Sequence, residues 1–200
     1  MNKTVAGVIL AGGRSTRMGA EKALIDLAGE PVIARVIARL RPQVGRIVIS
    51  ANGDARRFEP FALPVIADTM PRPGDEGPLA GIIAGLEWAE AEEISHIVFV
   101  PGDAPFLPED LVSRLGTHED TIAVAESETG IEPLFSLWPT STLENLKLLY
   151  AEGERAPRRA IGAMTHKIVP FEGDAISADP FFNLNRPDDV AAAEFWIKGW

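Results

Sequence analysis

The residues best suited to chemistry in this sequence form one glycine-rich, cationic stretch, LAGGRSTRMGAEK, at positions 10–22. It follows directly on an apolar run, which predicts a buried strand leading into it. A glycine-rich turn after a strand exposes backbone N–H groups that can cradle phosphate. Arg14, Arg17 and Lys22 add three cations within nine residues. This combination favours a triphosphate site over a tight turn that only carries surface cations.

Neither of the two familiar phosphate-binding patterns fits this stretch. The Walker A spacing fails because five residues separate Gly13 from Gly19 and no lysine follows Gly19. The dinucleotide pattern G-x-G-x-x-G fails because Gly12 and Gly13 are adjacent. The loop is therefore not that of a standard P-loop NTPase or of a dehydrogenase.

Two acidic residues follow other apolar runs. Asp103, in FVPGDAPF, comes after the end of a predicted buried strand, where a carboxylate can bind Mg²⁺. A lone aspartate in a loop more often makes a local turn or caps a helix, but a triphosphate site nearby favours the metal ligand. Asp68 opens a loop that runs to Gly77 and Pro78. That loop is either a solvent loop before a helix or a specificity loop that meets the ribose or the base.

Other chemistries are poorly supported. The chain has no cysteine, which excludes disulfides, thiolate metal sites and cysteine catalysis. Its three histidines are scattered, and no G-x-S-x-G nucleophile elbow is present. Phosphoryl or nucleotidyl transfer needs no protein nucleophile, because positioning and charge neutralisation supply most of the rate. This is the chemistry that the residues favour.

Composition and charge bound the class of protein. Two hundred residues with 46% hydrophobic content predict one domain, spanning 1–200, with a well-formed core. A net charge of −10 argues against a nucleic-acid partner. No run of 18 apolar residues exists, and the N-terminus passes straight into charged residues without the features of a signal peptide. We therefore expect no membrane association and a cytoplasmic location.

The predicted elements alternate between strands and helices. Strands are expected at 5–11, 45–50, 63–68, 95–100, 121–127, 132–139 and 166–172. Helices are expected at 31–43, 77–93, 108–115, 141–153, 155–164 and 186–200. Continuous apolar strands between helices predict an α/β fold with three αβα layers and a mostly parallel, Rossmann-like sheet. Ligands of such sheets bind beyond the carboxyl ends of the strands, which places 10–19, Asn52, Asp68 and 101–106 on one edge.

The motifs resemble a known family. LAGGRSTRMGAEK is similar to L-A-[GA]-G-x-x-x-R-M-G-x-x-K, the signature of nucleotidyltransferases with a glycosyltransferase-A-like (nucleotide-diphospho-sugar-transferase) Rossmann fold. Together with GPLAGIIAGL, PGDAPFLPEDLV and NLNRPDD, it most resembles the molybdenum cofactor guanylyltransferase family. The resemblance covers nearly the whole chain and is most specific in the first 110 residues. LAGG at this position, where cytidylyltransferases of molybdopterin usually have LAAG, favours guanine through Gly12.

The resemblance implies a reaction in which the terminal phosphate of molybdopterin attacks the α-phosphate of GTP and pyrophosphate leaves, with Mg²⁺ as cofactor. The implied catalytic residues are Arg17, Lys22 and Asp103, and Asp103 is also the implied Mg²⁺ ligand. The implied nucleotide-binding residues are Leu10, Ala11, Gly12, Gly13, Arg14, Lys22, Asn52, Asp68, Gly81 and Asp103. The pterin side is assigned to Asn183 and Asn185 of the N-x-N motif, with Arg155 and Arg158 as candidate phosphate ligands. These arginines and Arg159 could equally form a solvated helix face.

Two departures and several alternatives remain at this stage. Ser50 stands where related sequences often have asparagine, which shifts the expected nucleotide contact to Asn52. Arg186 stands where threonine is more usual.

The nucleotide-binding half is expected at 1–110 and the acceptor-binding half at 111–200. Protein partners would be a molybdenum insertion protein, molybdoenzyme apoproteins or their chaperones. The alternatives are a transferase that uses CTP with molybdopterin, one that uses an NTP with a sugar-1-phosphate, and a cofactor-carrying adaptor without catalysis.

Overall fold

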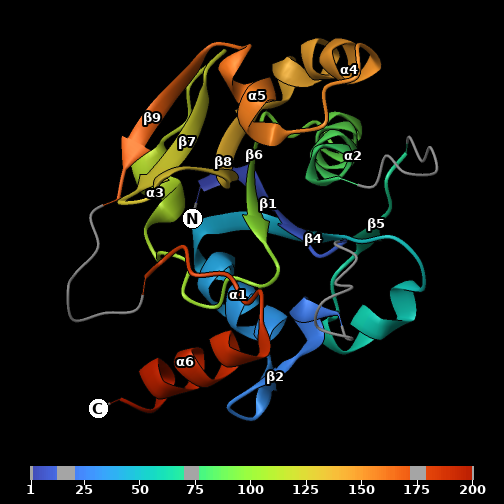
Figure 1. Cartoon of the computed structure of the whole chain (residues 1–200). Helices are drawn as coiled ribbons and strands as arrows, with labels where there is room; N and C mark the ends of the chain where they lie inside the picture. Colours follow the sequence, from blue (N-terminus) through green and yellow to red (C-terminus); the bar gives the residue numbers. More distant parts are fainter. Residues whose placement is uncertain (1, 13–20, 70–76, 172–178, 200) are drawn as a thin grey trace.

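A seven-stranded sheet organises the chain in the computed structural model, which describes residues 2–12, 21–69, 77–171 and 179–199 (Figure 1). The strand order is β5-β4-β1-β6-β8-β7-β9. The strands are β1 (Asn2–Leu10), β4 (Val44–Ser50), β5 (Val65–Ile66), β6 (His96–Pro101), β7 (Ile122–Ser127), β8 (Gly130–Pro139) and β9 (His166–Pro170). The predicted α/β class with a mostly parallel sheet is thereby confirmed.

The pairing of β1 with both of its neighbours creates the edge where a ligand can bind. β1 runs parallel to β4 and to β6, so that Leu10 lies opposite Ser50 on one side and Pro101 on the other. The chain first builds β4 and β5 on one side of β1 and then returns to place β6 on the other. Ligands of open parallel sheets bind at such a reversal of strand order.

One strand departs from the parallel arrangement. β8 lies antiparallel between β6 and β7, because a tight hairpin joins it to β7 with Ser127 opposite Gly130. Gly130 has a φ of 121°, a conformation that L-residues with a side chain rarely adopt. As a result, the N-terminal end of β8 approaches the carboxyl end of β6, where Ser136 pairs with Phe99.

Helices cover both faces of the sheet (Figure 1). They are α1 (Val32–Leu40), α2 (Pro78–Ala91), α3 (Leu111–Leu115), α4 (Leu143–Ala151), α5 (Pro157–Gly162) and α6 (Pro187–Lys198). Short 3₁₀ turns occur at η1 (Lys22–Leu24), η2 (Arg41–Gln43), η3 (Ala55–Phe61) and η4 (Thr140–Thr142). None of the helices in the described part of the chain is long and apolar enough to cross a membrane.

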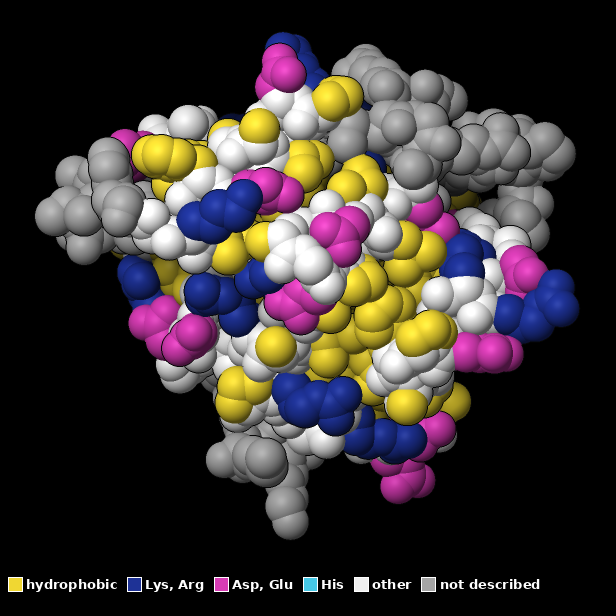
Figure 2. All heavy atoms as spheres, turned by 90° about the horizontal axis from the view of Figure 1, so that it is seen from below, with side chains coloured by type: hydrophobic (Ala, Val, Ile, Leu, Met, Phe, Trp, Pro, Cys, Tyr) yellow, Lys and Arg dark blue, Asp and Glu magenta, His cyan; other side chains and the backbone are white. Residues whose placement is uncertain are grey.

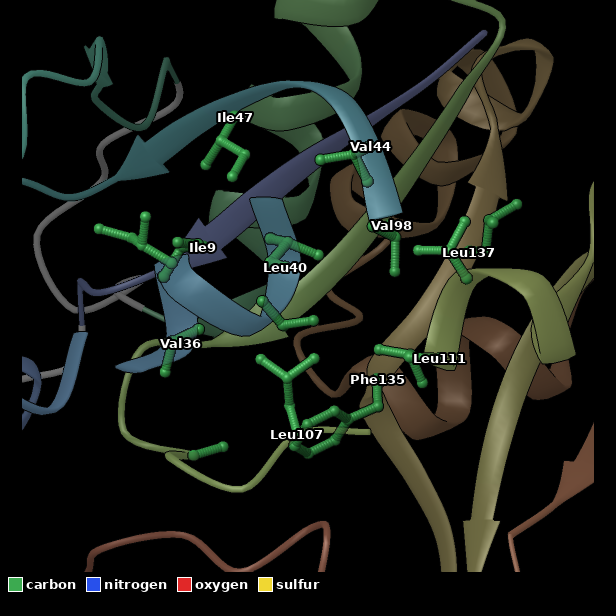
Figure 3. Packing of buried hydrophobic residues seen from close by; sticks show 14 of the residues in the cluster. Ile9, Val36, Leu40, Val44, Ile47, Val98, Leu107, Leu111, Phe135 and Leu137 are labelled. Atoms are coloured by element: carbon green, nitrogen blue, oxygen red, sulfur yellow. The ribbon is translucent and has the colours of Figure 1, made fainter. Parts of the chain in front are cut away.

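Alternating side chains of the strands pack into two separate hydrophobic cores, one on each face of the sheet. Ile9 and Val98 pack with α1 and α3 on one face (Figure 3), whereas Val8 and Phe99 pack with α2, α4 and α5 on the other. Successive residues of a strand point to opposite faces, so continuously apolar strands supply both cores at once. Both faces of the central strands are therefore buried under helices, and polar groups of these strands can contact a ligand only at the strand ends.

The helix predicted from Pro108 begins later, at Leu111. Leu107, just before Pro108, is fully buried in the core beneath α1 (Figure 3). The chain therefore turns inward at Leu107 before α3 can start. Burial of this one side chain outweighs the preference of proline for a first helical turn.

A hairpin that the sequence did not predict joins β2 (Asp26–Leu27) to β3 (Glu30–Pro31). Its turn residues, Ala28 and Gly29, both have positive φ, at 55° and 92°. Tight hairpins commonly use this backbone conformation. Leu27 is fully buried and packs against Leu184 and Ala193, so the hairpin supports α6 and the segment before it.

The face seen from below in Figure 1, on the side of α6 and β2, is mixed in character. Figure 2 shows apolar side chains exposed in its central part, with basic and acidic side chains around them. Acidic and basic groups stand next to each other, as in the Arg35–Glu30 pair at 3.1 Å and the Lys198–Glu194 pair at 2.9 Å. The described residues of this face therefore do not build a surface of a single charge sign.

The contact between Gly85 and Phe99 tests the packing of α2 on the sheet. A Cβ at Gly85 would lie 2.6 Å from a ring carbon of Phe99, and that ring packs edge-on against Trp138. We expect Gly85→Ala to lower the free energy of unfolding by about 1 kcal/mol, because overpacking outweighs the helix propensity of alanine. Gly162→Ala, in α5 with nothing within 4 Å, is the matched control and should not destabilise. Equal melting temperatures for both variants would contradict this account of the contact.

Candidate functional site

A pocket of about 220 Å³ lies where the strands of the reversal point end. The described residues that line it are Leu10, Ala11, Gly12, Glu21, Lys22, Ala23, Ser50, Asp68, Gly77, Pro78, Gly81, Pro101, Asp103 and Leu134. They come from the ends of β1, β4 and β6, from the start of α2 and from β8. The predicted edge of the sheet thus carries a cavity, and segments far apart in the sequence meet in it.

Backbone hydrogen bonds fix Leu10 and Ala11, the first two pocket residues. Ala11 N–H donates to the Ser50 carbonyl at 2.9 Å, and Gly102 N–H donates to the Leu10 carbonyl at 2.9 Å. Gly12 is exposed, so its backbone faces the open side of the pocket. Gly13, Arg14 and Arg17, which were also predicted to contact the nucleotide, lie outside the described residues. Leu10, Ala11 and Gly12 lie where the sequence placed them.

Lys22 joins three parts of the chain. Its Nζ lies 3.3 Å from Asp103 Oδ2 and 2.5 Å from Asn185 Oδ1. Leu184 N–H donates to the Asp103 carbonyl at 3.0 Å, which holds the segment before α6 against the end of β6. Three of the predicted residues, Lys22, Asp103 and Asn185, are therefore in one hydrogen-bonded group. The group joins two residues that were predicted to bind the nucleotide, Lys22 and Asp103, to one that was predicted for the pterin side, Asn185.

Asp103 carries a carboxylate in a place that disfavours its charge. Its side chain is only 20% exposed, and burial raises the pKa of Asp103 above its ordinary value. The charge of Lys22 and its hydrogen bond lower the pKa but do not cancel the effect of burial. One lysine therefore leaves the charge of Asp103 incompletely compensated, so a second cation at this carboxylate would be stabilised.

Asp68 reaches the pocket because Asn52 holds it. Asn52 Nδ2 donates to Asp68 Oδ2 at 2.7 Å, and Asp68 N–H donates to Asn52 Oδ1 at 2.9 Å. Ser50, which is 3% exposed, lines the pocket directly, while Asn52 is not among the described lining residues. The sequence had placed the nucleotide contact at Asn52. The structure gives Asn52 a supporting place behind Asp68 and puts Ser50 in the wall.

Gly81 allows the first turns of α2 to approach the sheet closely. A Cβ there would lie 2.9 Å from Ser50 Oγ and 3.0 Å from Leu10 Cδ2. Gly77 and Pro78 bring the start of this 14-residue helix into the pocket wall. The N-terminal end of a helix favours negative charge through its unpaired N–H groups. Together with Lys22, it gives the pocket two features that favour an anion.

The residues predicted for the pterin side are only partly brought to this group. The Arg155 guanidinium donates to the Tyr150 and Glu154 carbonyls, at 2.6 and 2.8 Å, and stacks on the Tyr150 ring. These contacts close the end of α4. The Arg155 carbonyl nevertheless lies 3.7 Å from the position of a Cβ at Gly77, so its backbone borders the pocket entrance. Arg158 is exposed on α5.

Arg159 and Asn183 have different surroundings. Arg159 pairs with Glu154 at 2.8 Å, and this hydrogen bond lowers the pKa of Glu154 to about 2. Arg159 thus has a local partner on the helix surface. Asn183 donates to the Phe181 carbonyl at 3.0 Å, while its Oδ1 is buried without a hydrogen-bond partner among the described residues. An unsatisfied buried acceptor calls for a donor, which a ligand could supply.

Sequence reasoning missed several residues of the pocket wall, among them Glu21, Ala23 and Leu134. Glu21 directly precedes Lys22, and its place within the predicted stretch 10–22 was a signal that could have been used. Leu134 belongs to β8, and it reaches the pocket only because β8 runs antiparallel beside β6. No local pattern in the sequence reveals that orientation, so Leu134 could not be found without the sheet topology.

The buried charge of Asp103 leads to a prediction about stability. Because its pKa is raised, its contribution to stability is favourable below the unfolded value near 3.8 and is lost as the pH rises through the folded pKa. We therefore expect Asp103→Asn to melt at a higher temperature than the wild type at pH 7, with a smaller difference towards pH 4. Thermal unfolding followed by circular dichroism checks this, with the exposed Asp110→Asn as control. A lower melting temperature at pH 7 would mean that the Lys22 ion pair outweighs burial.

Comparison with known proteins identifies the family of this chain. Residues 7–168 match the family model of the MobA-like NTP transferase domain. Proteins named molybdenum cofactor guanylyltransferase are 46% identical over 192 residues in Rhodobacter capsulatus and 44% identical over 201 residues in Mesorhizobium japonicum. The first alignment covers 95% of each chain and the second 96% of each.

A solved structure supports the fold independently. The molybdopterin-guanine dinucleotide biosynthesis protein A of Archaeoglobus fulgidus superposes with a TM-score of 0.71 at 23% identity. The superposition covers 94% of this chain and 96% of that one. The matched family model includes the strands and the α2 start that form the pocket. The chain belongs to the MobA-like NTP transferase family.

Proposed function

We propose that this protein transfers GMP from GTP to the terminal phosphate of molybdopterin, with or without bound molybdenum, and releases pyrophosphate. The observation that carries the proposal is the meeting of Lys22, Asp103 and Asn185 beside the exposed backbone of Gly12. One lysine and one buried carboxylate at the end of a parallel sheet suit nucleotidyl transfer. The near-full-length relatives named molybdenum cofactor guanylyltransferase support the choice of substrates.

Different residues of the pocket contact the base, the ribose and the phosphates of the nucleotide in this proposal. The Leu10–Gly12 backbone lies against the base and ribose, and Asp68, held by Asn52, accepts hydrogen bonds from the same part of GTP. Lys22 neutralises charge on the triphosphate and on the departing pyrophosphate. Arg14 and Arg17 are proposed for the same task. Gly12 is proposed to favour guanine, because the base can approach backbone where a side chain would stand.

The residues present fit a Mg²⁺ ion. Mg²⁺ in such sites is usually held by one or two carboxylates together with substrate phosphates. Asp103 offers one such carboxylate, with a pKa raised by burial that Lys22 does not fully offset. When bound, Mg²⁺ would neutralise charge on the reacting phosphates. Asp103 would hold it, and Lys22 would then be free to turn from Asp103 to the pyrophosphate.

The acceptor is proposed to enter from the side of the N-x-N motif. Asn185 already touches Lys22, and Asn183 has an unsatisfied buried oxygen, so both amides can turn to a pterin or its phosphate. Arg158, which is exposed on α5, is proposed as a phosphate ligand. We propose that residues 1–110 mainly bind the donor and 111–200 the acceptor. The setting would be the cytoplasm, where a molybdenum insertion protein, apoenzymes or their chaperones would be the protein partners.

The direct test is product formation by the purified protein. With molybdopterin, GTP and Mg²⁺ we expect pyrophosphate and the guanine dinucleotide, and calorimetry should show GTP bound more tightly than CTP or ATP. Equal affinity for the three nucleotides would contradict the guanine assignment. Pyrophosphate release with a sugar-1-phosphate, and none with molybdopterin, would select the alternative acceptor.

Asp103→Ala separates a transferase from an adaptor that only carries the cofactor. Loss of the proposed metal ligand should reduce turnover by about two to three orders of magnitude. Asp110→Ala, an exposed aspartate before α3 whose side chain makes no cap hydrogen bond, is the matched control and should keep full turnover. An Asp103→Ala protein that still supports cofactor maturation at the wild-type rate would favour the adaptor.

A further inference from the structure

Arg57 lies outside the described pocket wall, yet it contacts two of the segments that form it. It belongs to η3, the turn that follows β4. We infer that Arg57 is a positioning residue for the nucleotide site: it neutralises Glu21 in the pocket wall and fixes it beside Lys22. The inference rests on the proposed function, because it assumes that the pocket receives a triphosphate.

The contacts of Arg57 with Glu21 are those of a bidentate pair. Arg57 Nε donates to Glu21 Oε2 at 2.5 Å, and Nη2 donates to Oε1 at 3.1 Å. The two side chains are 25% and 23% exposed, so the pair is partly shielded from water. Such fork-shaped pairs fix geometry as well as charge, and lysine cannot reproduce them. The pair therefore holds Glu21 in one orientation.

Two backbone carbonyls and one ring hold Arg57 itself. Its Nη2 also donates to the Asn52 carbonyl at 2.7 Å, and its Nη1 donates to the Asp54 carbonyl. The guanidinium lies 4.6 Å from the centre of the Phe58 ring, and Phe58 is fully buried. Arg57 is thus anchored to the loop after β4 before it reaches Glu21. A movement of the Arg57 side chain together with Glu21 would break its hydrogen bonds to that loop.

These contacts tie together the two sides of the nucleotide pocket. Glu21 directly precedes Lys22 and starts the turn η1, in which Leu24 N–H donates to the Glu21 carbonyl at 2.9 Å. Asn52, whose carbonyl Arg57 holds, is the residue that fixes Asp68 through two hydrogen bonds. One guanidinium therefore connects the Lys22 side of the pocket with the Asp68 side.

Charge gives Arg57 a second effect. Glu21 lines the pocket, and an unpaired carboxylate there would repel a triphosphate. Paired with Arg57, its negative charge is balanced within hydrogen-bond distance. Lys22 is then not needed to balance Glu21, and its contacts go to Asp103 and Asn185 instead.

A double-mutant cycle tests the inference. In Arg57→Met we expect the Kd and the KM for GTP to rise about ten- to a hundredfold, as loss of a charge-assisted pair implies, with kcat changed by less than about threefold. Adding Glu21→Gln should recover GTP affinity, because the repelling carboxylate is then gone. Arg57→Lys should lie between the wild type and Arg57→Met. Arg56→Met is the matched control: this neighbour is exposed, pairs only with Asp54 among the described residues and should bind GTP as the wild type does.

Two results would overturn the inference. One is an Arg57→Met protein with the GTP affinity of Arg56→Met. The other is a double variant that binds GTP no better than Arg57→Met, which would leave Arg57 a merely structural role. If Arg57→Met does not fold, comparison of Arg57→Lys with Arg57→Lys/Glu21→Gln decides the same question. Failure of the proposed function is seen separately, because the wild type would then not bind GTP, and the cycle is run with the nucleotide that it does bind.

Discussion

The site depends on a buried carboxylate that its own surroundings do not fully neutralise. Asp103 follows the end of β6, a strand that is buried on both faces. The charge of Lys22 partly compensates that of Asp103, and Lys22 also contacts Asn185. Natural proteins often carry such unfavourable groups where chemistry takes place. The rest of the fold serves to hold this group: β1 and β6 place it, and the segment before α6 closes over it.

Much of the fold could be predicted from local patterns. Continuous apolar runs identified β1, β4 and β6, because both faces of these strands are covered by helices, and helical spacing identified α1. The direction of β8 could not be predicted, since an apolar run is the same read in either direction. The β2–β3 hairpin escaped notice because its strands are two residues long and its turn contains Ala28, an unusual residue at positive φ.

For the site, sequence reasoning found the residues that carry charge and named Asn52, but it did not predict which residues hold the charged ones in place. Lys22, Asp68 and Asp103 belong to recognisable motifs at strand ends, whereas Asn52 and Arg57 act through contacts with residues 16 and 36 positions away. A pattern in one stretch of sequence carries no information about such partners. The place of Ser50 in the pocket wall has the same origin, because only the pairing of β4 with β1 and β5 decides which side chain faces the pocket.

The bond between Lys22 and Asn185 spans 163 positions, nearly the length of the chain. During synthesis the donor-side wall can therefore form long before its last polar partner has left the ribosome. Contacts between such distant residues are among the slowest to form in folding. In a chain cut short before the N-x-N motif, Lys22 would lack the Asn185 amide that it now contacts together with Asp103. The group of Lys22, Asp103 and Asn185 can therefore form only after nearly the whole chain has been synthesised.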